Sequence, residues 1–150
     1  MKKLTYLLIL SIFLPIGLFA QNWEMNIDTA LSKAMKEDKH VVLVFSGLDW
    51  CVPCVKMDRN MWQSEIFKKY ANSNFVLLKA DFPKNRRGSQ ETAQIEHNEQ
   101  LKIKYNPKGL FPLIVLLDKN GEAIGHTLYK NIPAQEYIDM LNEIIATAKK

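Results

Sequence analysis

Cys51 and Cys54 are the only cysteines in this chain of 150 residues, and two residues separate them. They follow the apolar run 41–45, which has the composition of a buried strand. A Cys-x-x-Cys that leaves a buried strand and opens a helix is the arrangement of a thiol–disulfide redox site. The helix N-terminus supplies backbone N–H groups and a partial positive charge, both of which favour a thiolate. The pattern predicts a redox pair, against the alternatives of two neighbouring core cysteines or half of a metal site.

The histidines do not complete a metal site. His40, His97 and His126 are far from the cysteine pair in sequence, and no spacing among them matches a zinc motif. We therefore expect no metal and no separate cofactor, because the dithiol itself can carry two electrons.

The start of the chain is typical of a secretory signal peptide. A short basic start precedes the apolar run 4–19, and Ala20 offers a small residue for cleavage. We expect residues 1–20 to be a signal peptide and residues 21–150 to form one domain, exported to the periplasm or secreted from a bacterium. Export would place the thiols where disulfides persist.

An uncleaved membrane anchor is the alternative for this segment. The uncharged stretch 4–23 is long enough to span a bilayer, although Pro15 and Gly17 weaken a helix there. A membrane association is expected only in that case.

The charge balance does not favour nucleic acid as a partner. The chain has 20 basic and 16 acidic residues, and removal of Lys2 and Lys3 leaves 18 against 16, a net charge of +2. The one basic run, 84–88, contains Asn and Gly and follows Pro83, so it is interpreted as a solvated loop.

Hydrophobic patterning predicts an α/β fold. A lead-in and helix over 23–39, with Asp28 as N-cap, is followed by alternating strands and helices and by an Asn120-Gly121 hairpin. The first strand–helix–strand units require parallel pairing, and the hairpin adds antiparallel strands. The expected strands are 41–45, 75–80, 113–117 and 123–129, and the expected helices are 52–70, 89–105 and one opened by Pro133.

Three features together resemble the thioredoxin superfamily over residues 23–148. They are the motif 50–54 at a strand-to-helix junction, Phe111-Pro112 before the third strand, and the β-α-β-α-β-β-α order. Within the superfamily, the chain is similar to small exported thioredoxin-like proteins and to the soluble C-terminal domain of the bacterial thiol:disulfide interchange protein. The resemblance implies a three-layer sandwich with a mixed central sheet, an added N-terminal helix, and a cis bond before Pro112.

Two positions depart from the thioredoxin pattern. Thioredoxins keep a buried aspartate six positions before the first motif cysteine, where this chain has Phe45. In thioredoxins that carboxylate helps to move the proton of the second cysteine, so the group that accepts the Cys54 proton in this chain is not identified by the resemblance. Asp49 could accept it through water, or Asp49 could simply be a solvated residue. Val52 replaces the usual glycine and adds apolar surface at the rim.

The resemblance also assigns roles. Cys51, which precedes the helix and is expected to be partly exposed, would attack a substrate disulfide, and Cys54 would resolve the mixed disulfide. The expected partners are disulfide-containing proteins and a thiol electron donor, and the expected state is a monomer acting as a reductant or electron carrier. The alternatives are a net oxidase or isomerase, or a binding module without catalysis. The residues expected to form the substrate surface are Trp50, Val52, Pro53, Phe111 and Pro112.

Overall fold

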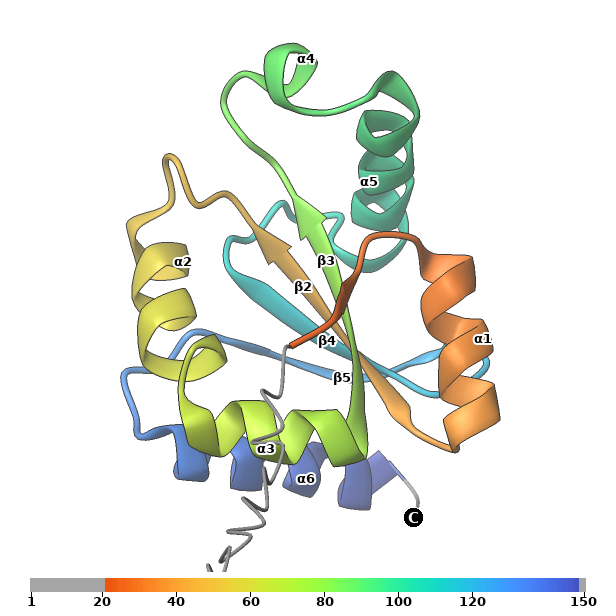
Figure 1. Cartoon of the computed structure of the whole chain (residues 1–150), viewed down its shortest axis with the longest axis vertical. Helices are drawn as coiled ribbons and strands as arrows, with labels where there is room; N and C mark the ends of the chain where they lie inside the picture. Colours follow the sequence, from red (N-terminus) through yellow and green to blue (C-terminus); the bar gives the residue numbers. More distant parts are fainter. Residues whose placement is uncertain (1–20, 149–150) are drawn as a thin grey trace, which may run out of the picture.

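The structure is a computed structural model that describes residues 21–148 (Figure 1). Within that range, five strands form one sheet in the order β1-β3-β2-β4-β5. The strands are β1 (Trp23–Glu24), β2 (His40–Ser46), β3 (Phe75–Asp81), β4 (Leu113–Leu117) and β5 (Ala123–Leu128). The helices are α1 (Ile27–Glu37), α2 (Val52–Met57), the π-helix η1 (Asp58–Trp62), α3 (Glu65–Asn74), α4 (Arg86–Ser89), α5 (Thr92–Tyr105) and α6 (Ala134–Ala148).

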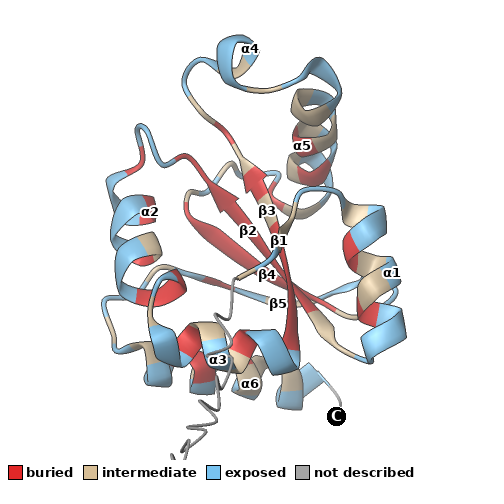
Figure 2. Ribbon diagram, viewed as in Figure 1, coloured by how far each residue is buried: buried red, intermediate tan, exposed pale blue. Residues whose placement is uncertain are grey.

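Strand β2 is the centre of a mixed sheet. It pairs in parallel with β3 and antiparallel with β4, and β4 pairs antiparallel with β5. Apart from half-buried His40, every β2 residue is buried, as expected for a strand covered on both faces (Figure 2). The predicted α/β sandwich with a mixed sheet is confirmed. Where β2 pairs with β3, Val44 lies opposite Lys79 and Ser46 lies opposite Asp81.

Helices cover both faces of the sheet and define two clusters of buried side chains. One face carries α2, η1, α3 and α6, and its cluster includes Val42, Val44 and Met57. The other carries α1 and α5, and its cluster includes Phe45 and Phe82. Because successive strand side chains point to opposite faces, odd and even positions of β2 belong to different clusters.

The lead-in to the first helix contains a strand that the sequence pattern did not predict. Trp23 pairs with Leu77 of β3, and its ring packs edge-to-face on Trp62 at 5.5 Å. The N-cap of α1 is Asn26, whose side chain accepts from the backbone of Asp28 and Thr29 at 2.9 and 3.1 Å. The prediction of Asp28 as N-cap was wrong, because the helix begins one residue earlier, at Ile27, and Asn26 caps its first turn.

The helix predicted over 52–70 is divided. The π-helix η1 follows α2, and α3 starts anew from Ser64, whose hydroxyl accepts from the backbone N–H of Phe67 at 3.3 Å. Met61 and Trp62 are consecutive, yet both are 3% exposed. Consecutive side chains of a regular α-helix point about 100° apart. Met61 and Trp62 are both buried in a segment that forms the wider turn of a π-helix.

The helix predicted over 89–105 is also divided. The short α4 ends at Ser89, and α5 begins at Thr92. The predicted signal peptide, residues 1–20, lies outside the described residues. Between residues 21 and 148, no helix has both the length and the apolar composition needed to cross a bilayer.

Candidate redox site

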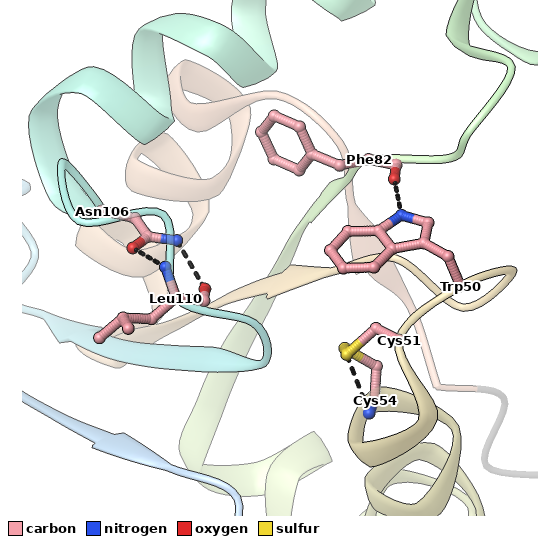
Figure 3. The surroundings of a disulfide bond; sticks show 6 residues. All are labelled: Trp50, Cys51, Cys54, Phe82, Asn106 and Leu110. Atoms are coloured by element: carbon pink, nitrogen blue, oxygen red, sulfur yellow. Dashed lines mark hydrogen bonds between the residues drawn. A yellow bond between two sulfur atoms is a disulfide. The ribbon is translucent and has the colours of Figure 1, made fainter.

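The two cysteines form a disulfide where β2 leads into α2 (Figure 3). Cys51 is the N-cap of α2, and its Sγ accepts a hydrogen bond from the backbone N–H of Cys54 at 3.3 Å. The N–H of Cys51 donates to the carbonyl of Gly47 at 2.8 Å, which fixes the turn before the helix. Pro53 lies in the first turn, where an N–H has no intrahelical partner, so its missing donor costs nothing.

The two cysteines differ in position rather than in exposure. Cys51 is 4% exposed and Cys54 2%, so the expectation of a partly exposed Cys51 is wrong for the disulfide form. The reason is that the Cys51 sulfur turns inward, onto the Cys54 N–H and sulfur. Val52, between them, is 64% exposed, so the apolar surface at the motif is provided by this side chain.

Trp50 joins three segments of the chain. Its Nε1 donates to the carbonyl oxygen of Phe82 at 2.6 Å, and its ring packs edge-to-face on Phe111 with centroids 5.1 Å apart. Phe82 and Phe111 pack on each other at 5.3 Å. Gly47 is required beneath the indole, because a Cβ there would lie 2.4 Å from two ring atoms of Trp50. The three aromatic residues therefore form one cluster, from the end of β3, the motif and the segment before β4.

The Phe111–Pro112 bond is cis, which confirms that prediction. Phe111 is half-buried and Pro112 is buried. The preceding loop is held by Asn106, which is 1% exposed: its Nδ2 donates to the carbonyl of Leu110, and its Oδ1 accepts from the Leu110 N–H, both at 2.8 Å (Figure 3).

Asn106 and Phe82 contribute to this architecture but were not singled out in the sequence. The turn composition Asn-Pro-Lys-Gly at 106–109 is a detectable signal for Asn106, and Gly109 adopts φ 64° there. Phe82 has no local signal, because its role depends on the pairing of β2 with β3: its N–H donates to the carbonyl of Ser46 at 2.8 Å.

Phe45 does not face the helix that carries the cysteines. It is fully buried in the cluster beneath α1 and α5, with its ring 6.3 Å from that of Phe82. The face beneath α2 receives Val44 and, by strand alternation, Ser46. A carboxylate at position 45 would therefore point away from the face that α2 covers in this structure.

Two carboxylates lie near the motif. Asp49 is exposed, and its Oδ2 accepts from the backbone N–H of Lys84 at 2.8 Å. Asp81 is half-buried at the end of β3. Burial raises the pKa of Asp81, with Asp49 acting in the same direction and Lys79 against it.

The histidines are not gathered around the cysteines. The Nε2 of His97 accepts from the backbone N–H of Ile27 at 3.1 Å, and His126 is an exposed residue of β5. Across residues 21–148, no group of three or more His, Cys, Asp or Glu side chains is arranged to hold a metal ion.

A thioredoxin-like family model matches residues 22–119, and the chain belongs to that thioredoxin-like family. It is 33% identical over 110 residues to the disulfide bond reductase DsbH of Chlamydia pneumoniae and 30% identical over 129 residues to the thioredoxin-related protein DsbJ of the same organism. The solved structure of a DsbH oxidoreductase superposes with a TM-score of 0.80 at 27% identity, covering 91% of this chain and 92% of that one.

The aligned segments cover 73% and 81% of this chain but only 64% of DsbH and 36% of DsbJ. The matched part of this chain therefore spans less than two thirds of the length of either relative.

Proposed function

We propose that the protein is an exported thiol–disulfide oxidoreductase that acts as a reductant or electron carrier. The observation that carries the proposal is the Cys51–Cys54 disulfide at the N-terminus of α2, next to the cluster of Trp50, Phe82 and Phe111. The similarity to a protein named a disulfide bond reductase supports the reducing direction.

In the proposed reaction, the reduced protein carries a thiolate at Cys51 and a thiol at Cys54. The Cys51 sulfur attacks one sulfur of a substrate disulfide, and the other substrate sulfur leaves as a thiolate. Cys54 then loses its proton and attacks Cys51, which forms the Cys51–Cys54 bond and releases the second substrate sulfur. The substrate gains two electrons and the motif loses two. A thiol donor restores the dithiol.

The chain positions Cys51 for the first attack. Cys51 is the N-cap of α2, and its sulfur accepts a hydrogen bond from the Cys54 N–H. The same donor would stabilise a thiolate at Cys51. Cys54 lies within the first turn of α2, and its sulfur is bonded to that of Cys51, which is the bond that resolution would form. These positions support Cys51 as nucleophile and Cys54 as the resolving residue.

The proposed substrate surface surrounds the disulfide. Trp50 is 40% exposed and Val52 64% exposed; Pro53 is also exposed. Phe111 and Pro112 are proposed to complete this surface, because half-buried Phe111 contacts Trp50 and Pro112 follows it through the cis bond. An apolar rim of this kind suits an extended segment of a partner protein that carries a disulfide.

The proposed location and partners follow from export. The basic and apolar start of the chain supports a signal peptide over residues 1–20, which would deliver a monomer to the periplasm or beyond. Disulfide-containing proteins would be the substrates there, and a thiol donor would be needed because that compartment is oxidising.

Turnover of insulin disulfides in dithiothreitol tests the function, and equilibration of the motif in a glutathione series tests its direction. We expect insulin reduction above the uncatalysed rate. We expect a potential near that of thioredoxin, about −270 mV, rather than near that of a strong oxidant, about −120 mV. A potential near the second value would contradict the reducing direction.

A further inference from the structure

We propose that Asp81 accepts, through water, the proton that Cys54 loses when it resolves the mixed disulfide. This inference rests on the proposed function. It supplies a proton acceptor for Cys54 in a chain that has Phe45 where thioredoxins have an aspartate.

The placement of Asp81 is the first argument. It lies at the carboxyl end of β3, directly opposite Ser46 of β2. By strand alternation it shares a face with Leu77, which belongs to the cluster beneath α2, η1, α3 and α6. Its side chain is therefore on the same face of the sheet as the helix that carries Cys54. The carbonyl oxygen of Phe82, the next residue, accepts a hydrogen bond from the indole of Trp50, so this end of β3 lies beside the motif.

The surroundings of the carboxyl group are the second argument. Its Oδ1 is buried and has no hydrogen-bond partner. The nearby Gln90 amide donates to the backbone carbonyl of Asp81 at 3.1 Å, while its own Oε1 is likewise buried without a partner. Asn98 also donates to that carbonyl, at 2.9 Å. The donors here satisfy the backbone of Asp81 and leave one carboxyl oxygen able to take a proton.

The charges around Asp81 are few. Lys79 on the same strand and the backbone N–H of Phe82 favour the ionised carboxylate, and Asp49 in the loop before α2 opposes them. From α2, the buried residues are the uncharged Cys54 and Met57, and Lys56 is exposed. Burial has the largest effect and raises the pKa of Asp81, which brings the carboxyl group closer to a thiol in proton affinity.

The step balances as follows. The Cys54 S–H proton passes to the Asp81 carboxylate, and the Cys54 thiolate attacks the Cys51 sulfur. The Cys51–Cys54 bond forms, the bond from Cys51 to the substrate breaks, and the substrate leaves as a thiolate. Asp81 then returns its proton to solvent. The first attack, by Cys51, does not involve Asp81.

Single-turnover reaction of the reduced protein with dithiobis(nitrobenzoate) separates the two attacks. The first thionitrobenzoate is released when Cys51 attacks, and the second when Cys54 resolves the mixed disulfide. For Asp81→Asn, we expect an unchanged first release and a second release slowed by about a hundredfold at pH 6, the low end of general-base effects. Its rate should then rise with pH as for an unassisted thiol of pKa about 8.5. Asp81→Glu should restore part of the rate.

Asp49→Asn is the matched control, because it removes the other nearby carboxylate. The proposal is overturned if Asp81→Asn leaves the second release and its pH profile unchanged, if it slows both releases equally, or if Asp49→Asn slows the second release instead. Should Asp81→Asn not fold, Asp81→Ser is tested in the same assay against the same outcomes. Absence of the first release from the unmodified protein would contradict the redox function itself, and so is distinguishable from failure of the role of Asp81.

Discussion

The indole nitrogen of Trp50 donates to the carbonyl oxygen of Phe82 across a distance of 2.6 Å, and this bond connects the redox motif to the end of β3. The ring of Phe111, one residue before Pro112, packs on the rings of Trp50 and Phe82. The surface beside the disulfide is thus assembled from three segments that are far apart in sequence. A change in any one of them is expected to affect substrate binding more than the intrinsic reactivity of the cysteines.

Replacement of Trp50 by Phe removes this hydrogen bond and keeps an aromatic ring against Phe111. We expect a loss of about 1 kcal/mol in the free energy of unfolding, as for one net hydrogen bond. In insulin reduction, KM should rise while kcat changes less. Denaturant unfolding and steady-state kinetics measure the two effects. An unchanged KM would show that the indole does not contribute to the substrate surface.

Gly47→Ala tests the same contact from below. A methyl group at this buried position would lie 2.4 Å from Trp50 Cε2 and Nε1, so the indole must move off the Phe82 carbonyl. We expect the indole N–H resonance of Trp50 to shift strongly in an NMR spectrum and KM to rise. A resonance that stays in place, with activity retained, would contradict the packing described for this site.

Asn106→Ala tests the loop that precedes Pro112. Asn106 is buried and makes two hydrogen bonds of 2.8 Å to the backbone of Leu110. Truncation removes both hydrogen bonds of this buried side chain, so we expect a loss of about 2 kcal/mol in the free energy of unfolding, about 1 kcal/mol for each bond. Asn131→Ala is the control, because Asn131 is exposed and accepts only from the Tyr129 hydroxyl. Equal effects of the two substitutions on denaturant unfolding would contradict a structural role for Asn106.

The raised pKa of Asp81 also leads us to expect that the stability of the protein depends on pH. The pKa of Asp81 is raised above its ordinary value of 3.8, so the folded state binds the proton more tightly than the unfolded chain does. Its contribution to stability is present below pH about 3.8 and is lost as pH rises through the folded-state pKa. Asp81→Asn should therefore gain stability relative to the unmodified protein as pH rises from about 4 to 7. Urea unfolding of the oxidised forms across that range measures this, and a constant difference would contradict it.

Features encoded by neighbouring residues could be predicted from the sequence. The strand β4 (Leu113–Leu117) agrees with its predicted range, because a continuous apolar run marks a doubly covered strand. The hairpin after it was indicated by Asn120-Gly121, and Gly121 adopts φ 84° there. The redox motif was equally local, since the cysteine spacing and the preceding strand lie within one short segment.

Features that depend on tertiary packing could not be predicted in this way. The strand β1 has only two residues and exists through its pairing with Leu77 and Leu78. The side of the sheet that Phe45 faces depends on the register in which β2 pairs with β3 and β4. The contact of Trp50 with Phe82 depends on how β2 and β3 align. In each case, the decisive partner is distant in sequence.

Cysteine substitution tests the central claim most directly. The purified Cys51→Ser and Cys54→Ser variants are each incubated, in reduced form, with a disulfide-containing protein, and covalent adducts are resolved on a non-reducing gel. The proposed roles predict that Cys54→Ser accumulates a mixed disulfide through Cys51, and that Cys51→Ser forms little adduct and does not reduce insulin. Full insulin reduction by Cys51→Ser, or adducts formed equally by both variants, would contradict the assignment of Cys51 as nucleophile and Cys54 as the resolving cysteine.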